Sequence, residues 1–213
     1  MQAEFVEKKK RKFTKEDIRT VVSVAWPSAL EAFFIALAGM VDTYMVSELD
    51  AAAVAAVGLT TQPKFIGLSL FNAIKIVLSS MVARRVGQKD RDKANALLTM
   101  GLLYTIVGSI IVSIVSVMFA DRFMIWMGSQ ADTHEYAVTY FRIIMGGLIF
   151  NTIQITINAA LRGTGNTKIA MRTNVTANIV NVVGNYLLIE GRHGFPALGI
   201  SGAAIATVFG TVV

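Results

Sequence analysis

The chain has 213 residues, of which 54% are hydrophobic and 16% are charged, with a mean hydropathy of +0.57 and a formal net charge of +6. Soluble domains contain about 25% charged residues and helices with a polar outer stripe, whereas the apolar residues here come in blocks long enough to cross a bilayer. The lack of cysteine excludes a disulfide framework and a thiolate metal site.

Six apolar blocks predict an all-α membrane protein built as a bundle of six transmembrane helices. The blocks cover residues 21–46, 51–82, 97–119, 136–161, 169–189 and the stretch from 197 onward. "TTQPK" at 60–64 interrupts the second block, and we expect Pro63 to kink or break that helix because proline removes a backbone donor. The last block is still apolar at Val213, which favours a truncated sixth span over a natural six-span protein with a short tail.

Lysine and arginine concentrate in alternate connections. They are abundant in residues 1–20, 83–93 and 161–172, while 47–51, 120–135 and 190–199 contain one or none. The positive-inside rule then makes residues 1–20 a cytoplasmic basic segment, followed by a transmembrane lobe over 21–213. The basic charge meets anionic lipid headgroups and implies no nucleic-acid partner. We expect an integral protein of a prokaryotic plasma membrane.

The fifth block carries four asparagines, Asn174, Asn178, Asn181 and Asn185, at spacings of four, three and four residues. At about 100° per residue they form one polar stripe within roughly 60°. Unsatisfied amides cost several kcal/mol in hydrocarbon, so the stripe must face other helices or water. Hydrogen bonding between helices is one explanation; four amides in register favour a water-lined cavity.

Two further sets of polar residues fall on single helical faces. The fourth block carries Asn151, Gln154 and Asn158 at helical spacing. In the first block Glu31 and Asp42 are eleven residues apart, about three turns, so both carboxylates share a face. We expect these residues to line a pathway through the membrane.

Asp42 lies in the apolar run "LAGMVDTYMV" and is the strongest functional candidate. An ionised aspartate near the bilayer centre costs on the order of 3 kcal/mol, so such a residue normally lines a substrate or ion path. A cavity that dries and wets in turn would move a proton on and off the carboxylate. Alternatively, carboxylate and amide oxygens suit Na⁺. A structural salt bridge to Lys75 is the third interpretation.

A series of motifs in fixed order resembles one known family. The stretches are "WPSALEAFFIALAGMVDTYMV", "AAVAAVGL", "MVARRVGQKD", "ALRGTGNTK", "NIVNVVGNYLLI" and "GFPALGISGAAIATV". Together they resemble the amino-terminal six-helix lobe of multidrug and toxic compound extrusion (MATE) transporters. The resemblance covers nearly the whole chain, from Trp26 to Val208.

The resemblance implies a twelve-helix exporter of two lobes that works by alternating access, of which the carboxy-terminal lobe is missing here. It implies export of cationic or amphipathic small molecules in exchange for Na⁺ or H⁺, with no other cofactor. By the same resemblance Asp42, Asn181, Asn185 and Thr207 form the cation site, with the first three as tentative Na⁺ ligands. The amide at Asn185 resembles the bacterial Na⁺-linked branch. Lys75 departs from the small or amide residue expected there, and would compete with a cation if it reached Asp42.

Two alternatives to a drug exporter remain. A lipid-linked sugar flippase of the same superfamily should have several cationic side chains inside the lobe, and only Lys75 is clearly placed so. A non-transporting membrane scaffold would not need two acids on one helical face. An enzyme is the least expected, because no nucleophile and base are arranged for catalysis.

Overall fold

The computed structural model describes residues 15–212, and within that range all regular structure is helical. The elements are α1 (Lys15–Ser47), α2 (Ala51–Gly87), α3 (Arg91–Met118), α4 (Ala120–Trp126), α5 (His134–Gly146), α6 (Leu148–Gly163), α7 (Thr167–Leu188), the 3₁₀ turn η1 (Arg192–Gly194) and α8 (Gly199–Gly210). The predicted basic segment 1–20 lies mostly outside the described residues. Its last part already belongs to α1, so the first helix begins earlier than residue 21.

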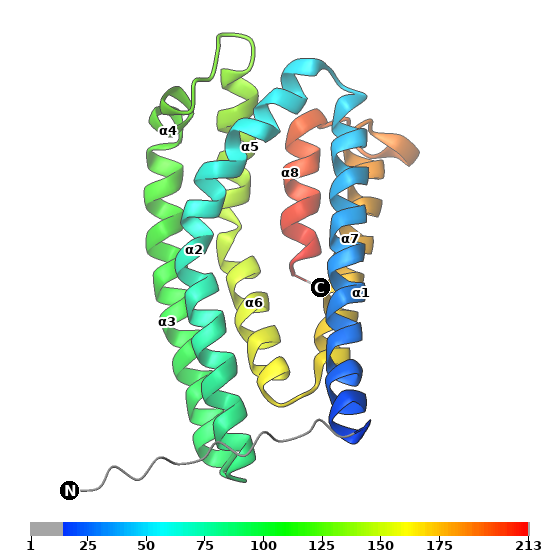
Figure 1. Ribbon diagram of the computed structural model, residues 1–213. Helices are drawn as coiled ribbons and strands as arrows, with labels where there is room; N and C mark the ends of the chain where they lie inside the picture. The colour runs from blue at the N-terminus through cyan, green and yellow to red at the C-terminus, as the bar shows by residue number, and fades with distance from the viewer. Residues whose placement is uncertain (1–14, 213) are drawn as a thin grey trace, which may run out of the picture.

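The second helix corrects the prediction of an interruption at 60–64. Helix α2 is continuous from Ala51 to Gly87 with Pro63 inside it. Its first turn is fixed by Asp50, whose carboxylate accepts a hydrogen bond of 2.6 Å from the backbone N–H of Ala53. Figure 1 shows the upper part of α2 slanted across the bundle, so the helix absorbs the proline without ending.

The fourth predicted span is instead two helices, α5 and α6, which meet at an angle of 48°. The break falls at the pair Gly146–Gly147, and adjacent glycines are a common cause of sharp kinks. A Cβ atom at Gly147 would lie 2.4 Å from Val208, so α8 packs directly against the backbone at the bend. The bend lets α5 pack on α8 while α6 diverges from it.

By length and composition, three helices can cross a membrane, namely Ala25–Ser47, α2 and α3. The bent pair α5–α6 can be a fourth span. Helix α7 carries the four asparagines and α8 has 12 residues, so neither has the length and apolarity of a lone span. Both pack inside the same bundle, where polar atoms find protein partners.

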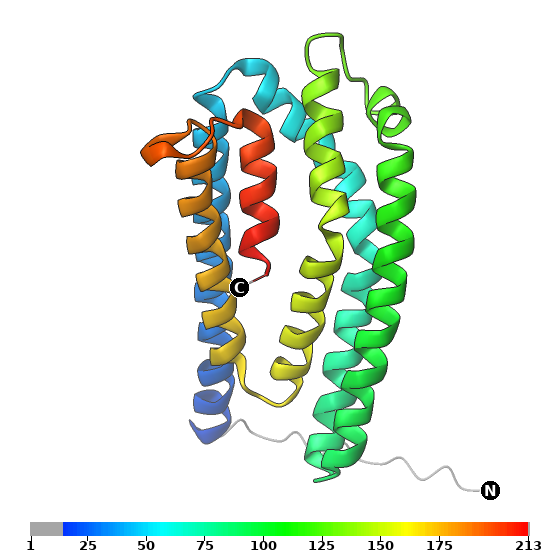
Figure 2. The same cartoon turned by 180° about the vertical axis from the view of Figure 1, so that it is seen from behind.

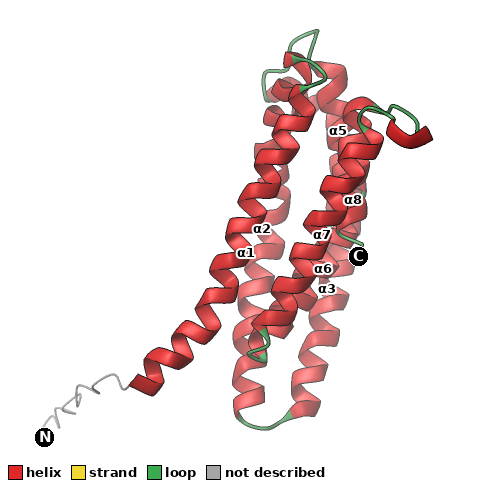
Figure 3. Ribbon diagram, turned by 90° about the vertical axis from the view of Figure 1, so that its right-hand side faces the viewer, coloured by secondary structure: helices red, strands yellow, loops and turns green. Residues whose placement is uncertain are grey.

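The helices form two groups that diverge toward one end (Figures 1 and 2). One group contains α1, α7 and α8, and the other contains α2, α3, α5 and α6. Helix α5 packs against α8 and so joins the groups at the end where α1 turns into α2. Figure 3 shows the helices running roughly side by side along the long axis.

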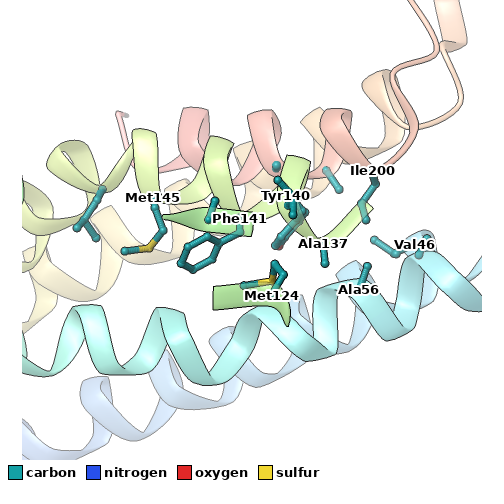
Figure 4. Close-up of a cluster of buried hydrophobic side chains, with 14 of the residues drawn as sticks. Val46, Ala56, Met124, Ala137, Tyr140, Phe141, Met145 and Ile200 are labelled. Atoms are coloured by element: carbon teal, nitrogen blue, oxygen red, sulfur yellow. The ribbon is translucent and has the colours of Figure 1, made fainter. Parts of the chain in front are cut away.

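A cluster of buried apolar side chains lies where the groups join (Figure 4). Phe141 and Met145 of α5 and Met124 of α4 are at most 1% exposed. Small residues such as Ala56 of α2 and Ala137 of α5 let the backbones approach closely, as is usual in membrane bundles. This core holds one end of the bundle together, and a smaller buried apolar cluster, Leu78, Val82, Ala159 and Ala160, joins α2 to α6 toward the other end.

Helix α3 buries polar side chains and exposes apolar ones, which is the reverse of a helix in a soluble protein. Its buried polar residues are Thr105, Ser109 and Ser116. Its exposed side chains are mostly large and apolar: Met100, Leu103, Tyr104, Val107, Ile110, Ile111, Ile114, Val115 and Met118. Thr105 and Thr156 of α6 share a buried hydrogen bond of 3.0 Å. Polar atoms inside and apolar side chains outside are the arrangement expected of a protein in lipid.

The described parts of the three basic stretches lie at one end of the bundle. The start of α1, the α2–α3 turn and the α6–α7 loop lie together at the lower end in Figure 1, and the poorly basic connections lie at the other end. This arrangement fits the alternation on which the orientation rests. The cytoplasmic position of the amino terminus stays a prediction.

We expect Gly202→Ala to destabilise the fold, because a Cβ there would lie 2.5 Å from the backbone oxygen of Leu188. Overpacking of this kind costs about 1–3 kcal/mol. The melting temperature of the purified protein in detergent should fall by several degrees. Gly87→Ala is the matched control, since nothing lies within 4 Å of its Cβ position. An equal loss in the control would contradict the packing explanation.

Candidate functional site

A cavity of about 350 Å³ lies between the two helix groups. Five helices contribute to it, namely α1, α2, α6, α7 and α8. Ten of the eleven predicted site residues line it: Glu31, Asp42, Lys75, Asn151, Gln154, Asn158, Asn174, Asn178, Asn181 and Thr207. The eleventh, Asn185, does not line this cavity: its amide donates to Asp42, and the residue lines a separate pocket between α1 and α7. The structure therefore brings together side chains up to 176 positions apart in the printed sequence.

Helices α1 and α7 are joined by two acid–amide hydrogen bonds in the same register. The Asn185 amide donates to Asp42 Oδ1 at 2.7 Å, and the Asn174 amide donates to Glu31 Oε1. Each pair is separated by 143 residues, because the acids and the amides are both eleven residues apart. Equal spacing on two parallel helices puts both bonds on the facing sides, three turns from each other. We call these bonds the upper rung (Asp42–Asn185) and the lower rung (Glu31–Asn174).

The upper rung extends to α8 through Asn181 and Thr207. One end of the Asn181 amide lies 2.9 and 3.0 Å from the two carboxylate oxygens of Asp42, and the other lies 3.1 Å from Thr207 Oγ1. With nitrogen toward Asp42, the amide donates to the ionised carboxylate. With oxygen toward Asp42, only acceptors face each other, and a proton or a cation must lie between them. The geometry therefore suits both an Asp42 carboxylate that has bound a proton or a cation and one that has bound neither.

Two residues at the upper rung were missed by sequence reasoning. Tyr140 of α5 is buried and lies beside Thr207. Lys64 of α2 interacts electrostatically with Asp42 without forming an ion pair with it. Lys64 belongs to "TTQPK", where the sequence predicts a kink or a break, and the continuous helix α2 places it inside the bundle. Tyr140 lies within an apolar block, and nothing in the sequence pattern marks it as a site residue.

The lower rung is part of a larger polar network at the basic end of the bundle. Arg162 of α6 donates to Glu31 at 2.5 Å, and the Asn158 amide donates to Asn174 Oδ1 at 2.9 Å. The Asn178 amide donates to the backbone oxygen of Asn174 at 2.9 Å. Glu31 is only 5% exposed, so its charge is compensated by Arg162 within the protein. Helical periodicity alone does not predict this partner for Glu31.

Some amide atoms at the cavity have no partner among residues 15–212. They are Asn151 Oδ1, Gln154 Nε2 and Asn185 Oδ1, and all three are buried from solvent. Buried polar atoms normally have a hydrogen-bond partner. An oxygen without one beside Asp42, and a donor and an acceptor on the cavity wall, are features of a site that receives a ligand.

Lys75 does not form the salt bridge with Asp42 that the sequence left open. Its ammonium donates instead to Asn72 Oδ1 at 2.9 Å, one turn earlier on α2. Within the described part of the chain, the ion pairs do not include either Lys75 or Asp42. The interpretation of Asp42 as half of a structural salt bridge with Lys75 is therefore wrong.

The profile of the MatE family matches residues 27–187. The chain belongs to the MATE family. It is 29% identical to the uncharacterized transporter YisQ of Bacillus subtilis over 91% of this chain, and 25% identical to the probable multidrug resistance protein NorM of Thermotoga maritima over 92%. It superimposes with a TM-score of 0.83 on a MOP superfamily transporter from Pyrococcus furiosus, at 27% identity over 91% of this chain.

The chain spans less than half the length of the proteins that it matches. It covers 43% of YisQ, 42% of the Thermotoga NorM and 42% of the Pyrococcus chain. The matched part is the amino-terminal lobe of a MATE transporter. MATE proteins are integral membrane transporters, not enzymes, and the helical bundle described above is that of the family.

We expect the stability of the protein to depend more on Arg162 than on the charge of Glu31. Arg162→Met leaves a buried carboxylate without its cation and should cost about 2 kcal/mol, a figure reduced because Arg162 is partly exposed. Glu31→Gln should cost less, since the freed guanidinium can reach water. The measurement is thermal unfolding of the single variants and of the double variant Glu31→Gln/Arg162→Met. In the double variant most of the loss should be recovered; strictly additive losses would refute charge compensation.

Proposed function

We propose that this chain is the amino-terminal lobe of a cation-coupled antiporter that exports cationic or amphipathic compounds. The observation that carries the proposal is the upper rung, where one carboxylate, two amides and a hydroxyl meet beside a cavity. The names of relatives add support, since the Thermotoga protein is described as a probable multidrug resistance protein. Coupling, direction and substrate remain parts of the proposal.

The coupling ion would bind at Asp42, Asn181, Asn185 and Thr207. Na⁺ prefers oxygen ligands, and this cluster offers the carboxylate, the hydroxyl and the unpartnered Asn185 Oδ1. Asn181 supplies a further oxygen when the oxygen of its amide, and not the nitrogen, faces Asp42. A proton on the carboxylate would satisfy the same arrangement through O–H donation to Asn181. The chemistry of the cluster thus accepts either Na⁺ or H⁺.

Substrate would bind in the cavity of about 350 Å³, which is within the range of small-molecule sites before a second lobe encloses it. A cationic group of the substrate and the coupling cation would compete for the charge of Asp42. By linkage, binding of one then weakens binding of the other by the same factor. Competition of this kind makes inward movement of the ion drive release of the substrate.

The flippase alternative is less favoured by the charges in the described part of the lobe. A diphosphate needs several free cations, and three cationic side chains lie at or near the cavity: Lys64, Lys75 and Arg162. Arg162 is paired with Glu31, and Lys64 faces Asp42. Only Lys75 has no acid beside it. A scaffold without transport is less favoured because it needs no amide-lined cavity.

Asp42→Asn in the complete transporter should reduce cation-driven efflux at least tenfold, because the variant can neither bind a proton nor offer a charge to Na⁺. The measurement is dye efflux from proteoliposomes, with a Na⁺ gradient at constant pH and, separately, a pH gradient without Na⁺. The gradient that drives the wild type identifies the ion. Asp92→Asn is the control, since Asp92 is exposed at the start of α3. Unchanged efflux in Asp42→Asn, at equal membrane levels, would refute the proposal.

A further inference from the structure

We propose that Lys75 is the binding point for an acidic group of the transported compound. This inference rests on the proposed transport function and narrows its substrate class. It assigns to the cavity a carboxylate-, sulfonate- or phosphate-bearing amphiphile whose cationic part faces Asp42. The lysine would then determine specificity and would have no part in ion coupling.

The balance of charge on the cavity wall leads to this assignment. Four ionisable side chains line the cavity, Glu31, Asp42, Lys75 and Arg162. Glu31 and Arg162 form an ion pair at 2.5 Å and neutralise each other. Asp42 is held by the Asn185 amide and faces Lys64. Among residues 15–212, Lys75 is the cavity-lining charge with no charged partner.

The position of Lys75 excludes the usual explanation of a lysine in a membrane helix. Lysines near helix ends extend their ammonium to the headgroup region. Lys75 lies seven residues before the apolar block of α2 ends at Val82, which is about 10 Å at 1.5 Å per residue and longer than the lysine side chain. Its ammonium lies at the cavity and contacts Asn72. A lysine placed so costs about 3 kcal/mol by insertion scales and normally marks a substrate or ion path.

Donors on the cavity wall, from Lys75 and Gln154, fit an anion. An ammonium has three N–H donors, and Asn72 takes one of them. Gln154 lines the same cavity, and its Nε2 is a buried donor without a partner in the described structure. Water can accept these bonds in an empty cavity. An acidic group would accept them with the added strength of a charge-assisted bond.

The opposite sides of the cavity would then recognise opposite charges. A purely anionic compound would be repelled by ionised Asp42 and would bind better once a cation neutralised it, which is the wrong sign for exchange. A compound with a cationic and an acidic group avoids this, because its cationic group competes with the coupling ion while its acidic group is held by Lys75. Exchange of the substrate for a cation is thus compatible with a lysine on the cavity wall.

A matched pair of dyes tests the assignment: a rhodamine with a free benzoic acid and the methyl ester of the same dye. Binding is measured by fluorescence anisotropy on the complete purified transporter, and efflux is measured in proteoliposomes. The wild type should bind the acid at least as tightly as the ester. Lys75→Gln should weaken acid binding about tenfold and leave ester binding unchanged. Lys75→Arg should keep the preference, and Lys168→Gln, on the exposed start of α7, should change nothing.

Equal effects of Lys75→Gln on both dyes, or tenfold tighter binding of the ester by the wild type, would overturn the inference. The comparison of the two dyes on the wild type needs no variant. It can therefore overturn the inference even if Lys75→Gln does not fold. Gradient-driven efflux of the ester together with either result would leave the proposed function standing. Lys75-dependent binding of the acid without gradient-driven efflux of either dye would support the subsite and refute the coupling.

Discussion

The cost of placing two carboxylates inside a membrane protein governs the arrangement of this lobe. Neither Glu31 nor Asp42 can be ionised in hydrocarbon without donors nearby, and α7 supplies one amide for each. Because the acids and the amides have the same spacing, the two rungs form together and fix the register of α1 on α7. A slip of one residue would break both bonds at once. Helices α1 and α7 are therefore positioned by polar contacts, whereas α2 and α6 pack through a small apolar cluster and the larger apolar core lies at the other end.

Much of this site could be predicted from helical periodicity alone. The spacing of Glu31 and Asp42, and of the four asparagines, placed each set on one face, and the structure shows these faces turned toward each other. Periodicity works here because lipid cannot satisfy amides or acids, so every polar stripe in a span must turn inward. The class of fold followed from the apolar blocks for the same reason.

What periodicity could not predict depends on contacts between distant segments. Pro63 predicted a kink or a break, and α2 bends and continues, so that Lys64 interacts electrostatically with Asp42. Arg162 looked like a residue of a basic loop, yet it belongs to α6 and pairs with Glu31. The glycine pair at the bend lies in the fourth block, but the packing of Val208 of α8 against that backbone is a contact that no pattern within the block contains. In each case the deciding partner lies in another helix.

The two rungs differ in the kind of partner that compensates the acid, and this difference separates their roles. Glu31 is the more buried acid, yet it has a guanidinium at 2.5 Å, so its charge is neutralised without any ligand. Asp42 is half-buried and has amides at hydrogen-bond distance, with the ammonium of Lys64 farther away. Amides stabilise a charge without neutralising it, so a cation entering the cavity gains more at Asp42 than at Glu31. Helix α1 thus contributes one acid to an ion pair with α6 and, three turns away, a second acid whose charge only amides contact directly.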